Sequence, residues 1–232
     1  MAQKKNNQKE NEALNLEETI SRSEMFIEKN KKLLVGIILL LVLLIAAIYL
    51  YKNYYVAARE NKAQVALIQG QNYFQAGNFE AALNGDSISY KGFVDVVKNY
   101  GSTKAGNLAK GYAGLSLAQM GKYKEALEYL KGFKAKDAMI GPAVKGSMGD
   151  CYANLEQPDK AVELWREAAN AADNNTVSPI FLKKAGVVLL EQGKADEALK
   201  LFQTIRDKYF NSMVVRDIDA YIERAELLKQ SK

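Results

Sequence analysis

The longest apolar run of the chain covers residues 33–51, LLVGIILLLVLLIAAIYLY, and contains no charged side chain. At about 1.5 Å per helical residue, this run is roughly as long as the 30 Å hydrocarbon layer of a bilayer is thick. We therefore predict a transmembrane helix over residues 33–51. A cleaved signal peptide is the alternative, because Val56, Ala57 and Ala58 suit a signal peptidase, but the run exceeds the apolar core of about 7–15 residues that such peptides use.

The two ends of this run differ in charge and in aromatic content. Directly before it stand Lys29, Lys31 and Lys32. Its downstream end carries a cluster of tyrosines, whose rings favour the headgroup region: Tyr49, Tyr51, Tyr54 and Tyr55. Because cytoplasmic flanks carry the excess of Lys and Arg, we predict a cytoplasmic N-terminus and a C-terminal domain on the outer side of the membrane.

The segment before the run changes character near Glu12. Residues 1–11, MAQKKNNQKEN, are too polar to bury a core, and we expect them to be disordered. Over residues 12–32, the apolar residues Leu16, Ile20 and Ile27 fall on or near one helical face. This spacing predicts a juxtamembrane amphipathic helix over residues 12–32.

A short string that is typical of a corner between two helices recurs after the run. It appears as GNFEAA from Gly77, GKYKEA from Gly121 and GKADEA from Gly193, and in a weaker form as EQPDKA from Glu156. Glycine permits the left-handed backbone that ends a helix, and alanine lets the two helices of a pair approach. Seven residues before each corner stands a second small residue: Gly70, Gly114, Gly149 or Gly186.

These copies resemble the tetratricopeptide repeat family, in which small and large apolar positions recur in this order about every 34 residues. Three of the corners are followed at the matching place by a large apolar residue, namely Leu130, Trp165 or Phe202, whereas Asp86 stands there in the first copy. The resemblance extends over roughly residues 60–212.

The spacing of the corners predicts the architecture. The intervals are 44, 35 and 37 residues, and the long first interval indicates an insertion around Asn84–Gly92. Residues 213–229 alternate apolar and charged positions, as a solvent-facing terminal helix does. We predict an all-α fold, in which one transmembrane helix is followed, over residues 52–232, by an α-solenoid of about four degenerate tetratricopeptide-type helix pairs and a C-terminal capping helix.

The composition restricts the chemistry. The chain has no histidine, and Cys151 is its only cysteine, which excludes histidine acid–base catalysis, Cys–His nucleophile pairs and intramolecular disulfides. We expect no enzyme activity, no cofactor and no metal site, and we interpret Cys151 and Trp165 as buried structural residues. The formal net charge of +5 comes from interleaved basic and acidic residues, so we expect no nucleic-acid partner.

In a tetratricopeptide array, the concave side lined by the first helices normally receives a peptide or a partner segment. We predict the groove residues from their phase in the repeats. They are Gln71, Phe74 and Gln75 in the first pair, Leu115 and Gln119 in the second, Asp150 and Asn154 in the third, and Lys183, Val187 and Glu191 in the fourth. Their mixture of amide and apolar side chains favours adaptable recognition of a protein segment.

The order of the segments adds a second resemblance. A short charged segment (EETISRSEMFIEKNKK), one span and a degenerate repeat domain resemble the bacterial YfgM-like family of ancillary SecYEG translocon subunits. This resemblance implies a bacterial inner-membrane protein with a periplasmic repeat domain, which works beside the SecYEG export channel and envelope chaperones. The alternatives are a scaffold for a cell-envelope assembly complex and a non-catalytic subunit of a membrane enzyme or transporter. The sequence predicts no oligomeric state.

Overall fold

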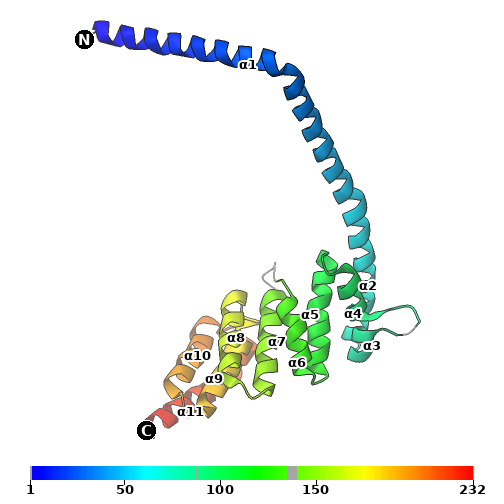
Figure 1. The fold of residues 1–232 in the computed structure, drawn as a ribbon. Coiled ribbons are helices and arrows are strands. Elements are labelled where there is room, and N and C mark those ends of the chain that lie inside the picture. The colour runs from blue at the N-terminus through cyan, green and yellow to red at the C-terminus, as the bar shows by residue number, and fades with distance from the viewer. Residues whose placement is uncertain (1, 87, 135–139, 232) are drawn as a thin grey trace. The chain divides into compact units, whose positions relative to one another are not determined.

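The computed structural model describes residues 2–86, 88–134 and 140–231, and the described side chains begin at Met25 (Figure 1). Within these ranges the chain forms helices and no strand, which confirms the all-α prediction. The chain divides into two compact units, residues 1–58 and residues 59–232.

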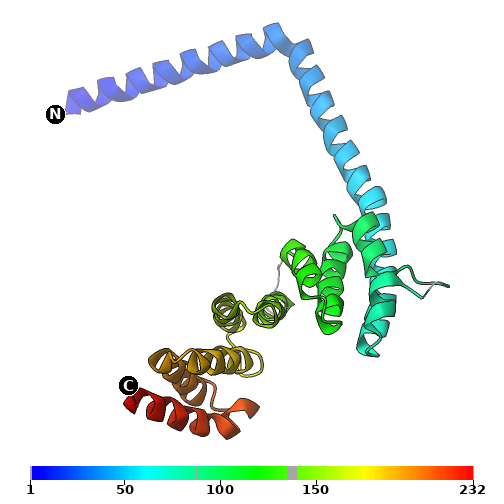
Figure 2. The ribbon, with the colours of Figure 1, turned by 60° about the horizontal axis from the view of Figure 1, so that its bottom comes forward.

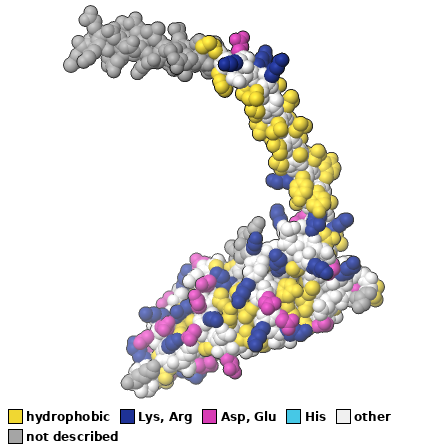
Figure 3. All heavy atoms as spheres, viewed as in Figure 1, with side chains coloured by type: hydrophobic (Ala, Val, Ile, Leu, Met, Phe, Trp, Pro, Cys, Tyr) yellow, Lys and Arg dark blue, Asp and Glu magenta, His cyan; other side chains and the backbone are white. Residues whose placement is uncertain are grey.

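The first unit is one long helix. It consists of α1 (Ala2–Leu50) and a π-helical segment, η1 (Tyr51–Val56). The apolar side chains from Leu33 onward are exposed around the helix (Figure 3), which is long and apolar enough to cross a membrane. The sequence predicts disorder for residues 1–11, and the structure includes residues 2–11 in α1; this stretch contains three Lys, three Asn and two Gln, and no Gly or Pro.

The second unit is a stack of antiparallel helix pairs. Successive pairs turn relative to one another, so that α7 and α8 are seen end-on in Figure 2 while the last helices lie across the view. The elements are α2 (Ala57–Gln75), α3 (Phe79–Asn84), α4 (Gly92–Tyr100), α5 (Lys104–Gln119), α6 (Tyr123–Gly132), α7 (Ile140–Asn154), α8 (Pro158–Ala172), α9 (Ser178–Glu191), α10 (Ala195–Lys208), the 3₁₀ helix η2 (Met213–Asp217) and α11 (Ile218–Gln230).

The four predicted corners are confirmed by their backbone conformation. Gly77, Gly121 and Gly193 have φ values of 75°, 76° and 71°, and Glu156 reaches a φ of 58° without the freedom of glycine. After each of these residues, the next N–H closes the same bond to a carbonyl oxygen five residues earlier, as in Lys122 to Leu117 at 2.9 Å. The weak copy at Glu156 is therefore a corner of the same kind.

The recurring glycines lie against the large side chains of the second helices. A Cβ atom would come within 2.6 Å of Leu130 if built at Gly114, and within 2.4 Å of Phe202 if built at Gly186. Gly70 faces Tyr90 and Phe93 in the same way, at 2.1 and 2.4 Å. With Gly149, where a Cβ atom would come within 2.6 Å of Trp165, the predicted phase of the repeats is correct in the second, third and fourth pairs.

The first pair differs from the sequence alignment of the repeats. Its second helix is split into α3 and α4 by the predicted insertion, and the aromatic residues Tyr90 and Phe93 after the insertion fill the place that Asp86 occupies in sequence. Asp86 instead organises the insertion. One of its carboxylate oxygens accepts hydrogen bonds from the N–H groups of Ile88, Ser89 and Tyr90 at 2.8–2.9 Å, and the other accepts from the Tyr73 hydroxyl at 2.7 Å.

Two groups of buried side chains form the core of this unit. One extends from Ala63 on α2 to Cys151 on α7, and the other from Ala161 on α8 to Ala225 on α11. The predicted capping helix begins as η2 and continues as α11, whose Ile218, Ile222 and Ala225 are buried against the last pair. The exposed face of α11 closes the end of the stack.

Candidate functional site

A cavity of about 600 Å³ lies between α7 and α9, with Trp165 of α8 and Val214 of η2 in its wall. Four of the predicted groove residues line it: Asp150, Asn154, Lys183 and Val187. Its other lining residues are Ala153, Trp165, Ile180, Lys184, Val188 and Val214. We call this cavity the α7–α9 groove.

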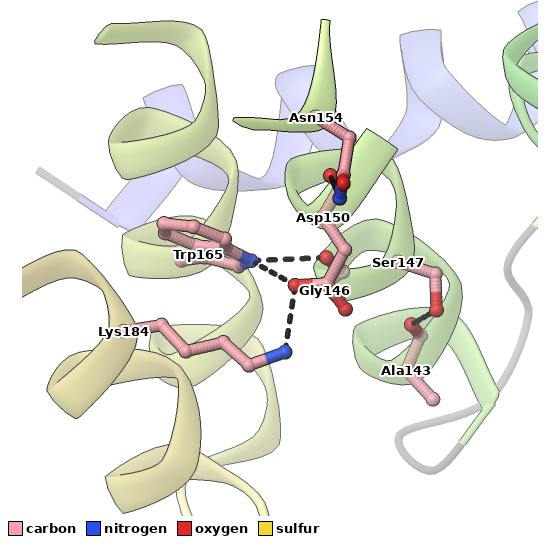
Figure 4. A network of polar contacts seen from close by, with 7 residues as sticks. All are labelled: Ala143, Gly146, Ser147, Asp150, Asn154, Trp165 and Lys184. Atoms are coloured by element: carbon pink, nitrogen blue, oxygen red, sulfur yellow. Dashed lines mark hydrogen bonds and ion pairs between the residues drawn. The ribbon is translucent and has the colours of Figure 1, made fainter. Parts of the chain in front are cut away.

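The floor of the groove is fixed by the indole ring of Trp165, which is only 4 % exposed. The ring packs over Gly149, where a Cβ atom would lie 2.6 Å from its Cδ1 and Nε1 atoms. Its N–H donates to the Gly146 carbonyl oxygen at 3.1 Å and to Asp150 Oδ1 at 2.9 Å (Figure 4). Trp165 is therefore a core residue, as predicted, whose polar edge also reaches the groove.

Both lysines of the groove are paired with carboxylates. Lys184 Nζ donates to Asp150 Oδ1 at 2.7 Å and lies 5.8 Å from the ring centre of Trp165 (Figure 4). Lys183 pairs with Asp217 and stands 4.6 Å from the ring centre of Tyr221. Neither lysine therefore offers an unpaired charge to a ligand.

Between these pairs the groove presents an apolar strip. Ile180 is 44 % exposed, and Val187, Val188 and Val214 are half-buried. The amide of Asn154 donates to the Asp150 carbonyl oxygen at 2.9 Å, which orients it at the edge of the strip. An apolar strip with a few oriented polar groups can hold the side chains of a protein segment.

The other six predicted groove residues lie outside this cavity. Phe74 packs edge-on against Phe79 and Tyr112, with ring centres 5.3 and 5.4 Å apart, so its ring is part of the packing between the first two pairs. Leu115 packs against the core, and Gln71 is half-buried. Exposed positions are taken by Gln75, Gln119 and Glu191.

Three lining residues that the repeat phase did not predict could have been found from their helical spacing. Ile180, Lys184 and Val188 continue the helical spacing of Lys183 and Val187 and lie on the same face of α9. Val214 gave no such signal, because it enters the groove from η2, whose position depends on the turn after α10.

Cys151 lies on α7 next to the groove residue Asp150, and its side chain is fully buried. Burial, and secondarily the negative charge of Asp150, raises the pKa of the Cys151 thiol to about 11. The thiol is therefore protonated at neutral pH and is a structural group, as predicted.

Two family models match segments of the second unit. A tetratricopeptide repeat model matches residues 184–212, from the middle of α9 through α10. A PPR repeat model matches residues 146–169, from α7 into α8. No curated protein matches the chain.

The helix pairs and these two partial matches support helical repeats of the tetratricopeptide type in residues 59–232. Such repeats imply protein partners, and proteins built from them are generally non-catalytic interaction modules.

Proposed function

We propose that this chain is a membrane-anchored interaction module that holds a segment of a partner protein in the α7–α9 groove. The observation that carries this proposal is the apolar strip of Ile180, Val187 and Val188 beside the oriented Asn154 amide. Apolar side chains of a bound segment would fill the strip, and its polar groups would bond to the edge.

The charge pattern favours a protein over RNA, although PPR repeats in other proteins read RNA bases. RNA binding requires cations that can neutralise phosphates, and both lysines of the groove are already paired with the carboxylates of Asp150 and Asp217. The charge pattern therefore favours a protein segment in the groove.

Binding in this groove should be weak for an isolated domain. The indole of Trp165 is packed in the core, so the strip presents aliphatic side chains instead of the exposed aromatic or arginine anchors that dominate tight interfaces. Membrane anchoring offsets this weakness, because a partner in the same bilayer reaches an effective concentration on the order of millimolar.

For the cellular setting we propose the bacterial inner membrane, with the N-terminus in the cytoplasm and the repeat unit in the periplasm. The lysines before the span support this orientation, and the resemblance to the YfgM-like family supports a partner at the SecYEG export channel or among envelope chaperones. A scaffold for envelope assembly would use the same groove for another partner, so the identity of the captured protein separates the two.

The test is affinity purification of the full chain from gently solubilised membranes, with quantitative mass spectrometry of the co-purifying proteins. The groove variant combines Asn154→Ala, Ile180→Ser and Val187→Thr, and leaves out Phe74 because of its packing role. Its matched control combines Glu163→Ala, Asn170→Ala and Lys200→Ala, at exposed positions of the second helices.

We expect the groove variant to lose a subset of partners that the control retains, while both keep their helical content by circular dichroism. Loss of SecYEG subunits in particular would support the export-channel setting. An unchanged partner set, or RNA as the component lost from the groove variant, would contradict the proposed function.

A further inference from the structure

A second cavity, of about 450 Å³, lies at the opposite ends of the helices from the corners, where one pair is joined to the next. Its wall is formed by the turn at residues 101–103, the start of α5 and the end of the second pair, with the ring of Phe133 on one side. Three lysines line it: Lys104, Lys110 and Lys134. We call these three residues the lysine edge.

The backbone around the lysine edge is held in place by side chains. The carboxylate of Glu60 on α2 accepts hydrogen bonds from the backbone N–H groups of Lys104 and Ala105, at 2.7 and 2.9 Å. The Asn107 side chain makes two hydrogen bonds to the backbone of Lys134, at 2.9 and 3.0 Å. Lys104 and Lys134 are therefore presented from fixed backbone positions.

The third lysine is placed by two glycines. The stem of Lys110 passes over Gly101 and Gly132, where added Cβ atoms would lie 3.7 Å from its Cε and 3.8 Å from its Cδ. Because neither glycine has a side chain, the stem of Lys110 can cross from α5 to the cavity; a Cβ atom at Gly101 would also come within 2.5 Å of the Val97 carbonyl oxygen. The three ammonium groups thus belong to one surface.

The positive charge of this surface is local. Among the described residues, the ammonium groups of the lysine edge form no ion pair with a carboxylate. The next connecting turn carries an acidic residue instead, Asp173, which pairs with Lys208 at 2.6 Å. The lysine edge therefore holds three cationic side chains without a carboxylate partner among the described residues.

The covalent connection limits how far the lysine edge can be from a bilayer. Glu60, which binds the start of α5, follows Tyr51, the last residue of the predicted span, by nine residues. Nine residues cover about 14 Å as a helix and at most about 31 Å when extended. If residues 33–51 cross a membrane, this connection is short enough for the lysine edge to reach the headgroups.

We propose that the lysine edge binds the phosphate groups of anionic lipids in the bilayer that holds the span. The chemistry of the surface is that of a phosphate site, since lysines are point charges that pair with phosphate oxygens. Each lysine near an anionic membrane surface adds to the attraction, and the effect decreases within a Debye length. Lipid binding would fix the orientation of the repeat unit and so the direction in which the α7–α9 groove is presented.

This proposal depends on membrane insertion of residues 33–51 and is independent of the partner in the groove. Its test uses the full chain in nanodiscs, made from phosphatidylcholine alone or mixed with phosphatidylglycerol. Lysine acetylation is followed residue by residue with mass spectrometry. The matched controls are Lys122 and Lys124, which lie at the other end of the same helix pair, about 24 Å away along α5.

In phosphatidylglycerol discs we expect acetylation of the lysine edge to be about fivefold slower, with Lys122 and Lys124 unchanged, and the protection to decrease at high salt. Equal acetylation in both kinds of disc would overturn the proposal. So would equal protection in phosphatidylcholine discs upon addition of inorganic phosphate or an acidic peptide, which would indicate a site for a soluble anion.

A second measurement uses variants. Hydrogen exchange of residues 99–110 should be slower on anionic discs for the wild type and for the Lys122→Gln, Lys124→Gln control. The variant with Lys104→Gln, Lys110→Gln and Lys134→Gln should lose this difference while melting at the wild-type temperature. Retention of the difference in the triple variant would also overturn the proposal.

Discussion

Gly149 on α7 lies directly beneath the indole of Trp165 on α8, because a Cβ atom at position 149 would approach the ring to 2.6 Å. The same contact sets the spacing of the third helix pair and the floor of the α7–α9 groove. A change at this glycine therefore acts on stability and on the groove together.

The substitution Gly149→Val should force the third pair apart and cost about 1–3 kcal/mol, as overpacking of a well-packed core does. Urea denaturation would measure the change. Gly132→Ala is the control, since its Cβ atom would be 3.8 Å from the flexible stem of Lys110, and no loss of stability is expected there. Equal midpoints for Gly149→Val and the wild type would disprove the packing role.

The corner alanines give a second stability prediction. Ala126 on α6 and Ala198 on α10 are fully buried where the two helices of a pair meet. Ala126→Trp or Ala198→Trp should cost about 1–3 kcal/mol or more, because the larger side chain has no space. If thermal melting of both variants stayed within about a degree of the wild type, the repeat phase would be wrong.

Asp86 predicts a dependence of stability on pH. Hydrogen bonds from the backbone N–H groups of Tyr90 and Ser89, and then from the Tyr73 hydroxyl, hold the pKa of its carboxyl well below the usual range. A group with a lowered folded-state pKa stabilises the fold above its unfolded pKa of about 4, and this contribution is lost as the pH falls through the folded-state value.

The measurement compares the wild type with Asp86→Asn. Asparagine has no second acceptor oxygen for the Tyr73 hydroxyl, so the variant should melt at a lower temperature at neutral pH. The gap between the two melting temperatures should shrink as the pH decreases below about 4. A gap that is independent of pH would show that the Asp86 carboxylate does not stabilise the insertion.

The orientation of the chain is tested with protease. If the lysines before the span set the direction, protease added to intact spheroplasts should digest the repeat unit. Digestion only after lysis would place the repeat unit in the cytoplasm. A cytoplasmic marker protein that survives in the intact sample is the control.

The sequence predicted the fold where local chemistry and packing repeat together. The corners at Gly77, Gly121 and Gly193 and the small residues at Gly114 and Gly186 recur in phase, and the structure places all of them as expected. Such positions can be predicted from the sequence because the contacts of each one lie within its own helix pair.

The sequence was less informative where a contact depends on a longer path of the chain. In the first pair, Tyr90 and Phe93 replace Asp86 against Gly70 because the insertion shifts the register. Phe74 has the phase of a groove residue, yet its ring is taken up by packing against Phe79 and Tyr112. The position of a residue in the repeat predicts which way its side chain points, but it does not predict which neighbouring side chains contact it.

The most direct test of the central claim is photocrosslinking from the groove in native membranes. A photoreactive amino acid at Asn154, in the groove, should form a light-dependent adduct with a partner protein, and the same group at Glu163, on an exposed position of α8, should not. The adduct from position 154 should also disappear when Ile180→Ser and Val187→Thr are introduced. An adduct from position 163 with none from position 154 would contradict the account and place the partner outside the α7–α9 groove.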